Sequence, residues 1–184
     1  MPGPVFLPGD RVSLHTIEEG DLEFLNENVN DPRVRRPLTS ADPANMAQSE
    51  EFFENVVAGE DSLNLLICVE SDEGDPEAVG DIALFDVGDR TRDGEIAITV
   101  APEHWGNGYA TEASRLLVEH AFDERNLHRL QTRVLATNDA SRRIWEKLGF
   151  EHEGRIRENQ YDDGEYVDTL YFGLLEREWR ERAD

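Results

Sequence analysis

The chain has 184 residues, of which 38% are hydrophobic, and its 41 acidic side chains against 18 basic ones give a formal net charge of −23. This charge argues against binding nucleic acid through phosphates, and no apolar run is long enough to span a membrane. The length favours a single domain, residues 1–184. Because the start, MPGPVFLPGD, has neither the basic nor the apolar segment of a secretion signal, we expect a cytoplasmic protein.

The acidic residues are spread along the chain rather than gathered in a tail, and Lys147 is the only lysine. We interpret this composition as adaptation to a salt-rich cytoplasm, a halophilic acidic protein. At molar salt the Debye length shrinks to about 3 Å, which screens the self-repulsion of such a chain. Cys68 is the only cysteine, so an internal disulfide is excluded. Its place in an apolar run predicts a buried, unreactive thiol.

The first third of the chain predicts one strand followed by two helices. Residues 11–15 alternate as in a strand, and residues 17–28 carry apolar side chains at helical spacing before a break at 30–32. A second helix is expected over about 43–59. Its phenylalanines Phe52 and Phe53, like Phe24, are expected in the core rather than against a substrate.

The middle of the chain predicts an antiparallel meander. Residues 63–69, 78–85 and 94–100 are apolar or β-branched runs joined by short polar loops. A helix begins near Tyr109, and a further strand follows at 130–135. Because a helical crossover separates this last strand from 94–100, we expect the two to lie parallel.

The last part predicts a helix and a hairpin. The helix covers residues 138–148, with Asn138 as N-cap and Gly149 as the stop at its C-terminus. Strands at 150–158 and 166–174, joined by YDDGE, close the chain. The order of elements predicts a mixed α/β fold with one central sheet.

Residues 96–111, IAITVAPEHWGNGYAT, form a strand, a glycine loop and a helix start in direct succession. Gly106 and Gly108 allow a ligand to approach the backbone closely, and the unpaired N–H groups at a helix start attract anions such as pyrophosphate. The spacing alone is equally compatible with a plain connection between strand and helix. A P-loop is excluded because Gly108 is not followed by Lys-Ser/Thr, and Thr111 does not fit the dinucleotide fingerprint.

HWGNGYATEA and, about thirty residues later, TNDASRRIWEKLGFEHEGRIREN resemble the GNAT acetyltransferase superfamily, and within it the Rim-type acetyltransferases of ribosomal-protein N-termini. The family's pyrophosphate loop, Gln/Arg-x-x-Gly-x-Gly/Ala, falls on residues 105–110, where Trp105 departs from the broad pattern. The resemblance covers about residues 12–179. It implies a GNAT fold, in which the two parallel strands splay apart at their C-terminal ends, here Val100 and Leu135.

The resemblance also implies acetyl-CoA as co-substrate, with its thioester in the notch between the splayed strands. Pyrophosphate would lie on the glycine loop and pantetheine along the edge of the preceding strand. Asn138 would contact the cofactor as well as cap its helix, and Arg143 could pair either with the 3′-phosphate or with a surface acid. The expected cofactor-binding residues are Ile98, Val100, Trp105, Gly106, Asn107, Gly108, Tyr109, Ala110, Thr111, Asn138 and Arg143.

Acetyl transfer to an amine needs a proton acceptor, a donor for the oxyanion and a proton for the departing thiolate. A strand N–H near Ile98 to Val100 is the candidate oxyanion donor. Ser141 matches a serine of some Rim-like relatives and is the candidate acid, although a hydroxyl in a first helical turn also explains it. Glu95 and Glu158 are candidate bases, directly or through a water, or else surface acids.

The resemblance therefore implies an acyltransferase that moves acetyl to a primary amine by direct attack in a ternary complex. A protein N-terminal α-amine is the expected acceptor. A small amine (polyamine, amino sugar or amino acid) is the alternative, and an acyl-CoA sensor without turnover is a third possibility. No metal is expected, since His104 has no histidine or cysteine at ligand spacing. Asp168 matches a Rim-like aspartate without an assigned role, and monomer and homodimer both stay open.

Overall fold

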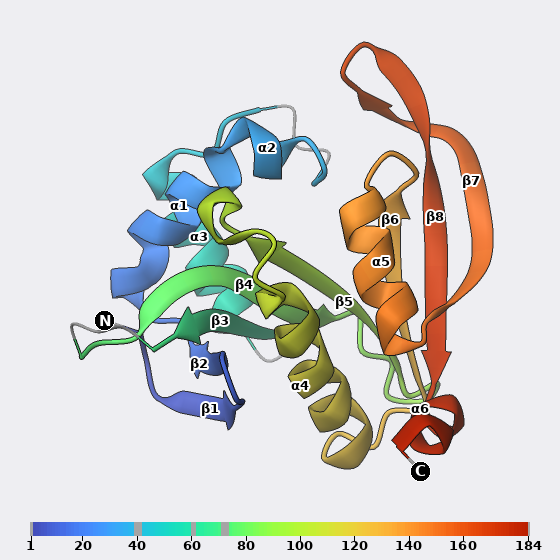
Figure 1. Cartoon of the computed structure of the whole chain (residues 1–184). Coiled ribbons are helices and arrows are strands. Elements are labelled where there is room, and N and C mark those ends of the chain that lie inside the picture. Colours follow the sequence, from blue (N-terminus) through green and yellow to red (C-terminus); the bar gives the residue numbers. More distant parts are fainter. Residues whose placement is uncertain (1, 39–41, 60–61, 71–73, 184) are drawn as a thin grey trace.

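The computed structural model describes residues 2–38, 42–59, 62–70 and 74–183. Every strand of these residues belongs to one eight-stranded sheet in the order β1-β2-β3-β4-β5-β6-β8-β7 (Figure 1). The strands are β1 Val5–Pro8, β2 Ser13–Thr16, β3 Leu63–Val69, β4 Glu77–Phe85, β5 Asp93–Val100, β6 Arg129–Leu135, β7 Glu151–Asp162 and β8 Glu165–Leu175. The helices are α1 Leu22–Asn30, α2 Pro32–Arg35, α3 Met46–Phe52, α4 Tyr109–Asp123, α5 Asp139–Leu148 and α6 Glu176–Ala183.

The predicted meander and crossover are confirmed. Strands β3, β4 and β5 pair antiparallel, and β5 pairs parallel with β6 after the α4 crossover. The parallel pairing covers only Asp93–Glu95 against Arg129–Gln131. Beyond these residues β6 keeps its pairing with β8 as far as Leu135, whereas its register with β5 ends. The splay of the two parallel strands toward Val100 and Leu135 is therefore present in the structure.

The sequence prediction missed three elements. Strand β1 is a short, largely exposed VFLP segment at the sheet edge, which has no alternation to detect. Helix α2 follows the predicted break at once, because the Asp31 side chain accepts the N–H of Arg33 and Pro32 stands in the first turn. Helix α6 is highly charged and gains an Arg180–Glu176 ion pair one turn apart, at 2.8 Å.

Several predicted boundaries also moved. The first helix begins at Leu22, after a short 3₁₀ turn at Glu19–Asp21. Strand β7 continues past Glu158 to Asp162 because a bulge between Ile156 and Gln160 absorbs the irregularity. Glu158 therefore lies within the strand, not at its end.

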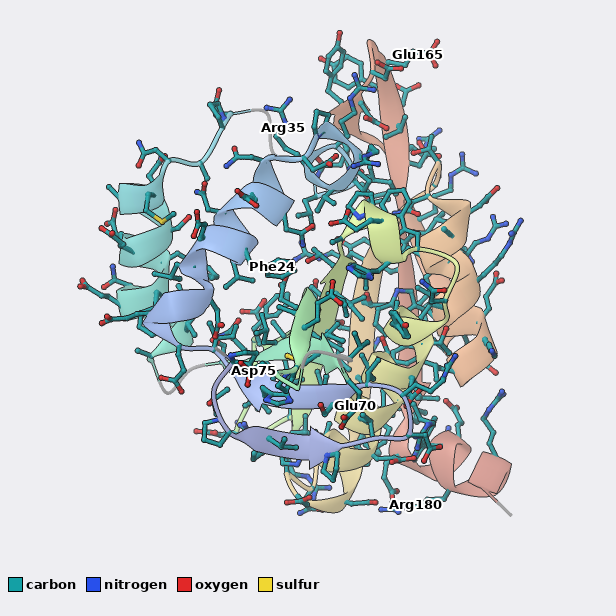
Figure 2. All side chains as sticks on the ribbon, turned by 60° about the vertical axis from the view of Figure 1, so that its left-hand side comes forward. Phe24, Arg35, Glu70, Asp75, Glu165 and Arg180 are labelled. Carbon is teal, nitrogen blue, oxygen red and sulfur yellow. The ribbon has the colours of Figure 1, made fainter. Side chains whose placement is uncertain are left out.

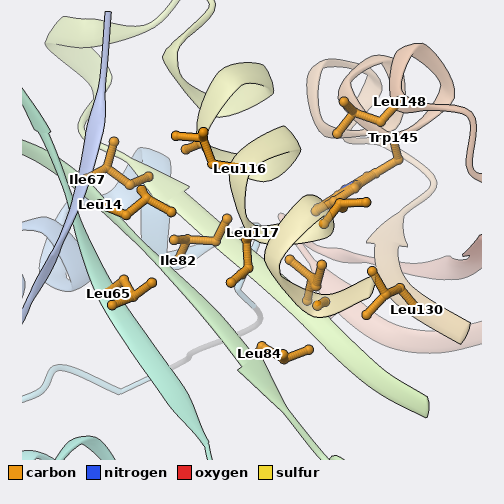
Figure 3. Close-up of a cluster of buried hydrophobic side chains, with 14 of the residues drawn as sticks. Leu14, Leu65, Ile67, Ile82, Leu84, Leu116, Leu117, Leu130, Trp145 and Leu148 are labelled. Atoms are coloured by element: carbon orange, nitrogen blue, oxygen red, sulfur yellow. The ribbon is translucent and has the colours of Figure 1, made fainter. Parts of the chain in front are cut away.

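The two faces of the sheet bury separate sets of side chains. The larger core lies between the sheet and helices α4 and α5 (Figure 3). Its fully buried members include Leu14, Leu65, Ile67, Ile82, Leu84, Leu117, Leu130 and Trp145. No helix in the described ranges is long and apolar enough to cross a membrane.

The smaller core lies on the opposite face, where Phe24 of α1 and Phe53 pack against Ile17, Leu66 and Cys68 (Figure 2). Cys68 is buried as predicted, and burial raises the pKa of its thiol to about 12. The thiolate needed for a nucleophile is therefore strongly disfavoured. The prediction for Phe52 was wrong, since this side chain is 52% exposed.

Candidate active site

The loop between β5 and α4 has the backbone geometry of an anion-binding turn. Gly106 and Gly108 have φ values of 81° and 82°, in the left-handed region that glycine adopts without strain. Gly108 is also the N-cap of the 15-residue helix α4. The first N–H groups of α4 consequently have no partner within the helix and can bind an anion.

A buried carboxylate and an arginine hold this loop against the start of β2, which the sequence prediction missed. The Arg11 side chain donates from Nη1 to the Asn107 carbonyl at 2.9 Å and from Nε to Glu112 Oε2 at 2.8 Å. Glu112 Oε1 also accepts the N–H groups of Asp10 and Arg11. Burial raises the pKa of Glu112, but these hydrogen bonds outweigh burial and hold it below its ordinary value. Glu112 is thereby kept ionised.

Trp105 ties the same loop to the end of β5. Its indole Nε1 donates to the Val100 carbonyl at 2.7 Å, while the side chain is 52% exposed. Trp105, which stands where the family usually has Gln or Arg, thus fixes the loop through its indole N–H. About half of the Trp105 side chain remains accessible.

A pocket of about 570 Å³ adjoins the glycine loop. Three acids line it, Asp10, Glu112 and Glu119, of which Glu112 pairs with Arg11 and Glu119 with Arg115. Four cationic side chains also line it. They are Arg11, Arg115, Lys147 and Arg182. Arg143, the expected phosphate partner, is exposed on α5 and lies outside this lining. The cationic residues that the sequence did not single out are better placed than Arg143 for a phosphate at this pocket.

The splayed part of β5 offers free backbone donors. The Ala101 N–H donates to the Val79 carbonyl next to β4, at 2.8 Å. Because successive N–H groups of a strand point to opposite edges, those of Val100 and Ile98 point to the edge from which β6 has separated. The candidate oxyanion donors therefore face the notch.

Ser141 lies in the first turn of α5. Its N–H donates to the Asn138 side chain at 3.1 Å, which confirms Asn138 as the N-cap. Its Oγ accepts a hydrogen bond from the indole Nε1 of the buried Trp145 at 3.2 Å. The hydroxyl proton of Ser141 is thus still available for another acceptor.

The two candidate bases have different surroundings. Glu95 is 5% exposed, and its carboxylate accepts hydrogen bonds from Arg133 Nε at 2.6 Å and Gln131 Nε2 at 3.3 Å. It also stands where β5 and β6 are still paired. Glu158 is exposed in the β7 bulge. Glu95 is therefore engaged by a cation, and Glu158 is open to solvent.

Asp168 now has a structural explanation. Its carboxylate accepts the Glu158 N–H at 2.7 Å and a hydrogen bond from the Arg155 side chain. The Glu158 hydrogen bond, followed by Arg155, lowers the pKa of Asp168 despite its burial. Since Glu158 has a left-handed φ of 48°, Asp168 holds the bulge in a conformation that few side chains adopt freely.

A second pocket, of about 440 Å³, lies at the C-terminal end of β6. Its lining residues include members of helix α2 and of the tip of the β7–β8 hairpin, two elements that lie at the same end of the molecule (Figure 1). Its charged lining residues are Arg33, Arg36, Asp162 and Asp163. Asn138 of the α5 N-cap also lines it. In the part of the chain that the structure describes, no group of three or more His, Cys, Asp or Glu side chains is placed to hold a metal ion.

This combination of splayed parallel strands, glycine loop and capped α5 is the frame of an acetyltransferase. The chain belongs to the acetyltransferase (GNAT) domain family, whose sequence model matches residues 11–151. The resemblance to the GNAT superfamily is therefore confirmed.

The curated proteins that resemble this chain are named as N-acetyltransferases. The chain is 25% identical over 174 residues to the uncharacterized N-acetyltransferase p20 of Bacillus licheniformis, covering 92% of this chain and 96% of p20. It is 36% identical over 105 residues to the putative ribosomal N-acetyltransferase YdaF of Bacillus subtilis, covering 57% of each. The spermidine N(1)-acetyltransferase of Vibrio cholerae is 25% identical over 179 residues, covering 95% of this chain and 98% of the relative.

The crystal structure of spermidine N-acetyltransferase from Vibrio cholerae in complex with CoA and spermine shares the fold. Its TM-score is 0.85 at 22% identity, covering 94% of this chain and 99% of that one. Together, the family and these relatives define an acyltransferase, an N-acetyltransferase that uses acetyl-CoA as co-substrate.

Proposed function

We propose that the protein acetylates the α-amine of a protein or peptide N-terminus by direct attack on acetyl-CoA in a ternary complex. The observation that carries the choice of acceptor is the charge of the pocket between α2 and the hairpin tip. Arg36 pairs with Asp163 at 3.4 Å, and Arg33 pairs with Asp31 at 2.6 Å. Such a balanced lining suits a chain with one ammonium group and a neutral backbone, and it offers a polycation little attraction.

Direct attack is supported by the lack of an acyl carrier. Cys68, the only cysteine, is fully buried under α1, and burial raises the pKa of its thiol. An acetyl-cysteine intermediate would require a thiolate at the notch. The amine itself is therefore the nucleophile in this proposal.

Different residues carry out the other steps of the proposed reaction. The N–H groups of the glycine loop and α4 receive the pyrophosphate, and those of Ile98 and Val100 stabilise the oxyanion of the tetrahedral intermediate. Ser141 gives its proton to the departing thiolate, and Trp145 keeps the hydroxyl in position.

A polyamine is the second candidate acceptor. It is favoured by the similarity to spermidine acetyltransferases, which extends over nearly the whole chain rather than over part of it.

The pKa of the acceptor, in contrast, favours the peptide N-terminus. An α-amine has a pKa near 8, about two units below a lysine-like amine, so it demands less of a base at neutral pH.

The test is thiol release from acetyl-CoA, in high potassium chloride, with peptides that begin with Ala, Ser or Met. Each peptide is paired with the same sequence blocked by an N-terminal acetyl group, and spermidine, amino sugars and free amino acids are run alongside. We expect turnover of one class of free peptide and none of its blocked partner. A kcat/KM at least tenfold higher for spermidine would overturn the peptide proposal in favour of the polyamine. Binding of acetyl-CoA without any turnover would identify a sensor.

A further inference from the structure

A polar cluster stands on the sheet face that α1 covers, beside the splayed part of β5. Asp81 on β4 and Thr99 on β5 are cross-strand partners, and the next pair on the same face of the sheet is Ala83 with Ala97. Asn28 reaches the pair from α1. Both pairs are partly exposed, so the cluster can be reached by a ligand.

The hydrogen bonds of the cluster run in one direction. Asn28 Nδ2 donates to Thr99 Oγ1 at 3.1 Å, and the Thr99 hydroxyl donates to Asp81 Oδ1. This series of hydrogen bonds satisfies the Thr99 hydroxyl and leaves two acceptor atoms without a donor. One is the second oxygen of Asp81, to which no described residue donates. The other is Asn28 Oδ1, which is buried and has no hydrogen-bond partner in the structure, on a residue only 6% exposed.

Asp81 has no ion-pair partner among the described residues, in contrast to Glu95, which pairs with Arg133. Burial raises the pKa of Asp81 to about 6, and the Thr99 hydrogen bond offsets only part of this effect. A partly buried carboxylate without a cation is unfavourable for the fold. Carboxylates with a raised pKa of this kind cluster at functional sites.

We propose that Asp81, Thr99 and Asn28 form the subsite for the primary ammonium of the acceptor, and that Asp81 takes the proton that the amine must lose. An ammonium group has three N–H donors, which match the free oxygen of Asp81 and Asn28 Oδ1 with one N–H left over. The proposal rests on amine acetylation, but it holds for a peptide and for a small amine alike.

The position along β5 suits the reaction. Thr99 is the residue between Ile98 and Val100, so the ammonium subsite and the candidate oxyanion donors share one short segment of strand. Attack requires the nitrogen about 3–3.5 Å from the carbonyl carbon. An amine held by Asp81 would approach the notch from the α1 face, opposite the side on which α4 and α5 pack.

The proton and electron changes balance in this arrangement. One N–H proton of the ammonium moves to the Asp81 carboxylate, and the freed lone pair forms the bond to the acetyl carbon. When the intermediate collapses, the carbon–sulfur bond breaks and its electron pair leaves on sulfur, which takes the Ser141 proton. A second proton passes from nitrogen to solvent, and solvent restores the Ser141 hydroxyl and the Asp81 carboxylate.

The test compares Asp81→Asn with Asp89→Asn, which makes the same change at an exposed turn residue. We expect Asp81→Asn to lower kcat/KM for any accepted amine about 100-fold or more, with the Kd for CoA unchanged. Asn28→Ala should raise the KM for the amine about tenfold. Wild-type turnover by Asp81→Asn would overturn the proposal.

A second measurement reads the subsite without turnover. n-Butylamine is titrated by NMR into the CoA-bound wild type and the two aspartate variants. We expect binding at least tenfold weaker in Asp81→Asn than in Asp89→Asn, and equal binding would refute the subsite. If the wild type acetylates no amine but binds butylamine through Asp81, the proposed function fails and the subsite stands.

Discussion

Trp145 donates a hydrogen bond from its indole Nε1 to the Oγ of Ser141, 3.2 Å away and one turn earlier on α5. The indole is only 1% exposed, and its ring packs edge-on against Phe150 with centroids 5.1 Å apart. This confined donor occupies one lone pair of the Ser141 hydroxyl. The Ser141 hydroxyl is therefore held as a donor toward a third group, as an acid for a thiolate would have to be.

Replacing Ser141 by alanine tests the acid directly. We expect kcat to fall about 100-fold, because the thiolate then leaves without a positioned proton. The Kd for CoA, measured by calorimetry, should not change, since Asn138 still caps the helix. Unchanged turnover in the thiol-release assay would remove Ser141 from the mechanism.

Trp145→Phe separates the hydrogen bond from the packing. We expect kcat to fall about three- to tenfold, with the KM for acetyl-CoA unchanged, because the serine hydroxyl loses its fixed orientation. Phe150→Leu is the control: it loosens the same aromatic contact without touching the indole N–H. It should lower the melting temperature but leave kcat unchanged. Equal effects of the two substitutions on kcat would assign Trp145 a packing role only.

Local signals made much of the frame predictable. The glycine loop and the Asn138 cap depend on residues a few positions apart, and the helical crossover dictated that β5 and β6 run parallel. The Arg11–Glu112 contact joins residues 101 positions apart, and the Asp81–Thr99 pair depends on strand register. No local pattern encodes either relationship. Phe52 was misassigned because it stands next to Phe53, and the sequence alone does not show which of two adjacent aromatic side chains the helix turns toward the sheet.

Gly108→Ala should weaken cofactor binding. Alanine at this position would have to adopt φ 82°, which L-residues rarely do, and its Cβ would lie 3.2 Å from Arg11 Nη2. Arg11 is the side chain that holds the loop. We expect the Kd for CoA to rise about tenfold and the protein to lose about 1 kcal/mol of stability. The matched control is Gly154→Ala, where a Cβ meets nothing within 4 Å. Calorimetric titration of CoA into both variants gives the comparison, and equal affinities would argue against a loop site.

Glu112→Gln should make the stability of the fold less dependent on pH in the acidic range. Hydrogen bonds from Arg11 and its neighbours lower the pKa of Glu112 below its ordinary value of 4.5 despite burial. Its stabilising contribution is therefore complete above about pH 4.5 and is lost as the pH falls through the lower, folded-state value. The variant should melt at a lower temperature than wild type at pH 7, and this difference should shrink toward pH 3. A constant difference across this range would contradict the assignment.

Asp81→Asn should stabilise the fold while it impairs the enzyme. Burial raises the pKa of Asp81 from 3.8 to about 6, so the folded state favours the protonated form. The contribution of Asp81 is complete below about pH 3.8 and is lost as the pH rises through about 6. Its cross-strand neighbours Leu66 and Thr99, and Asn28 beyond them, do not titrate.

At pH 7.5 the amide variant is therefore expected to gain up to about 3 kcal/mol relative to wild type, a rise of several degrees in melting temperature. The gain should vanish near pH 4, and Asp89→Asn should show none at either pH. Thermal scans of the three proteins across this pH range provide the measurement. A variant less stable than wild type at pH 7.5 would mean that the Asp81 carboxylate is satisfied within the fold. In that case it would not be held in readiness for an acceptor ammonium.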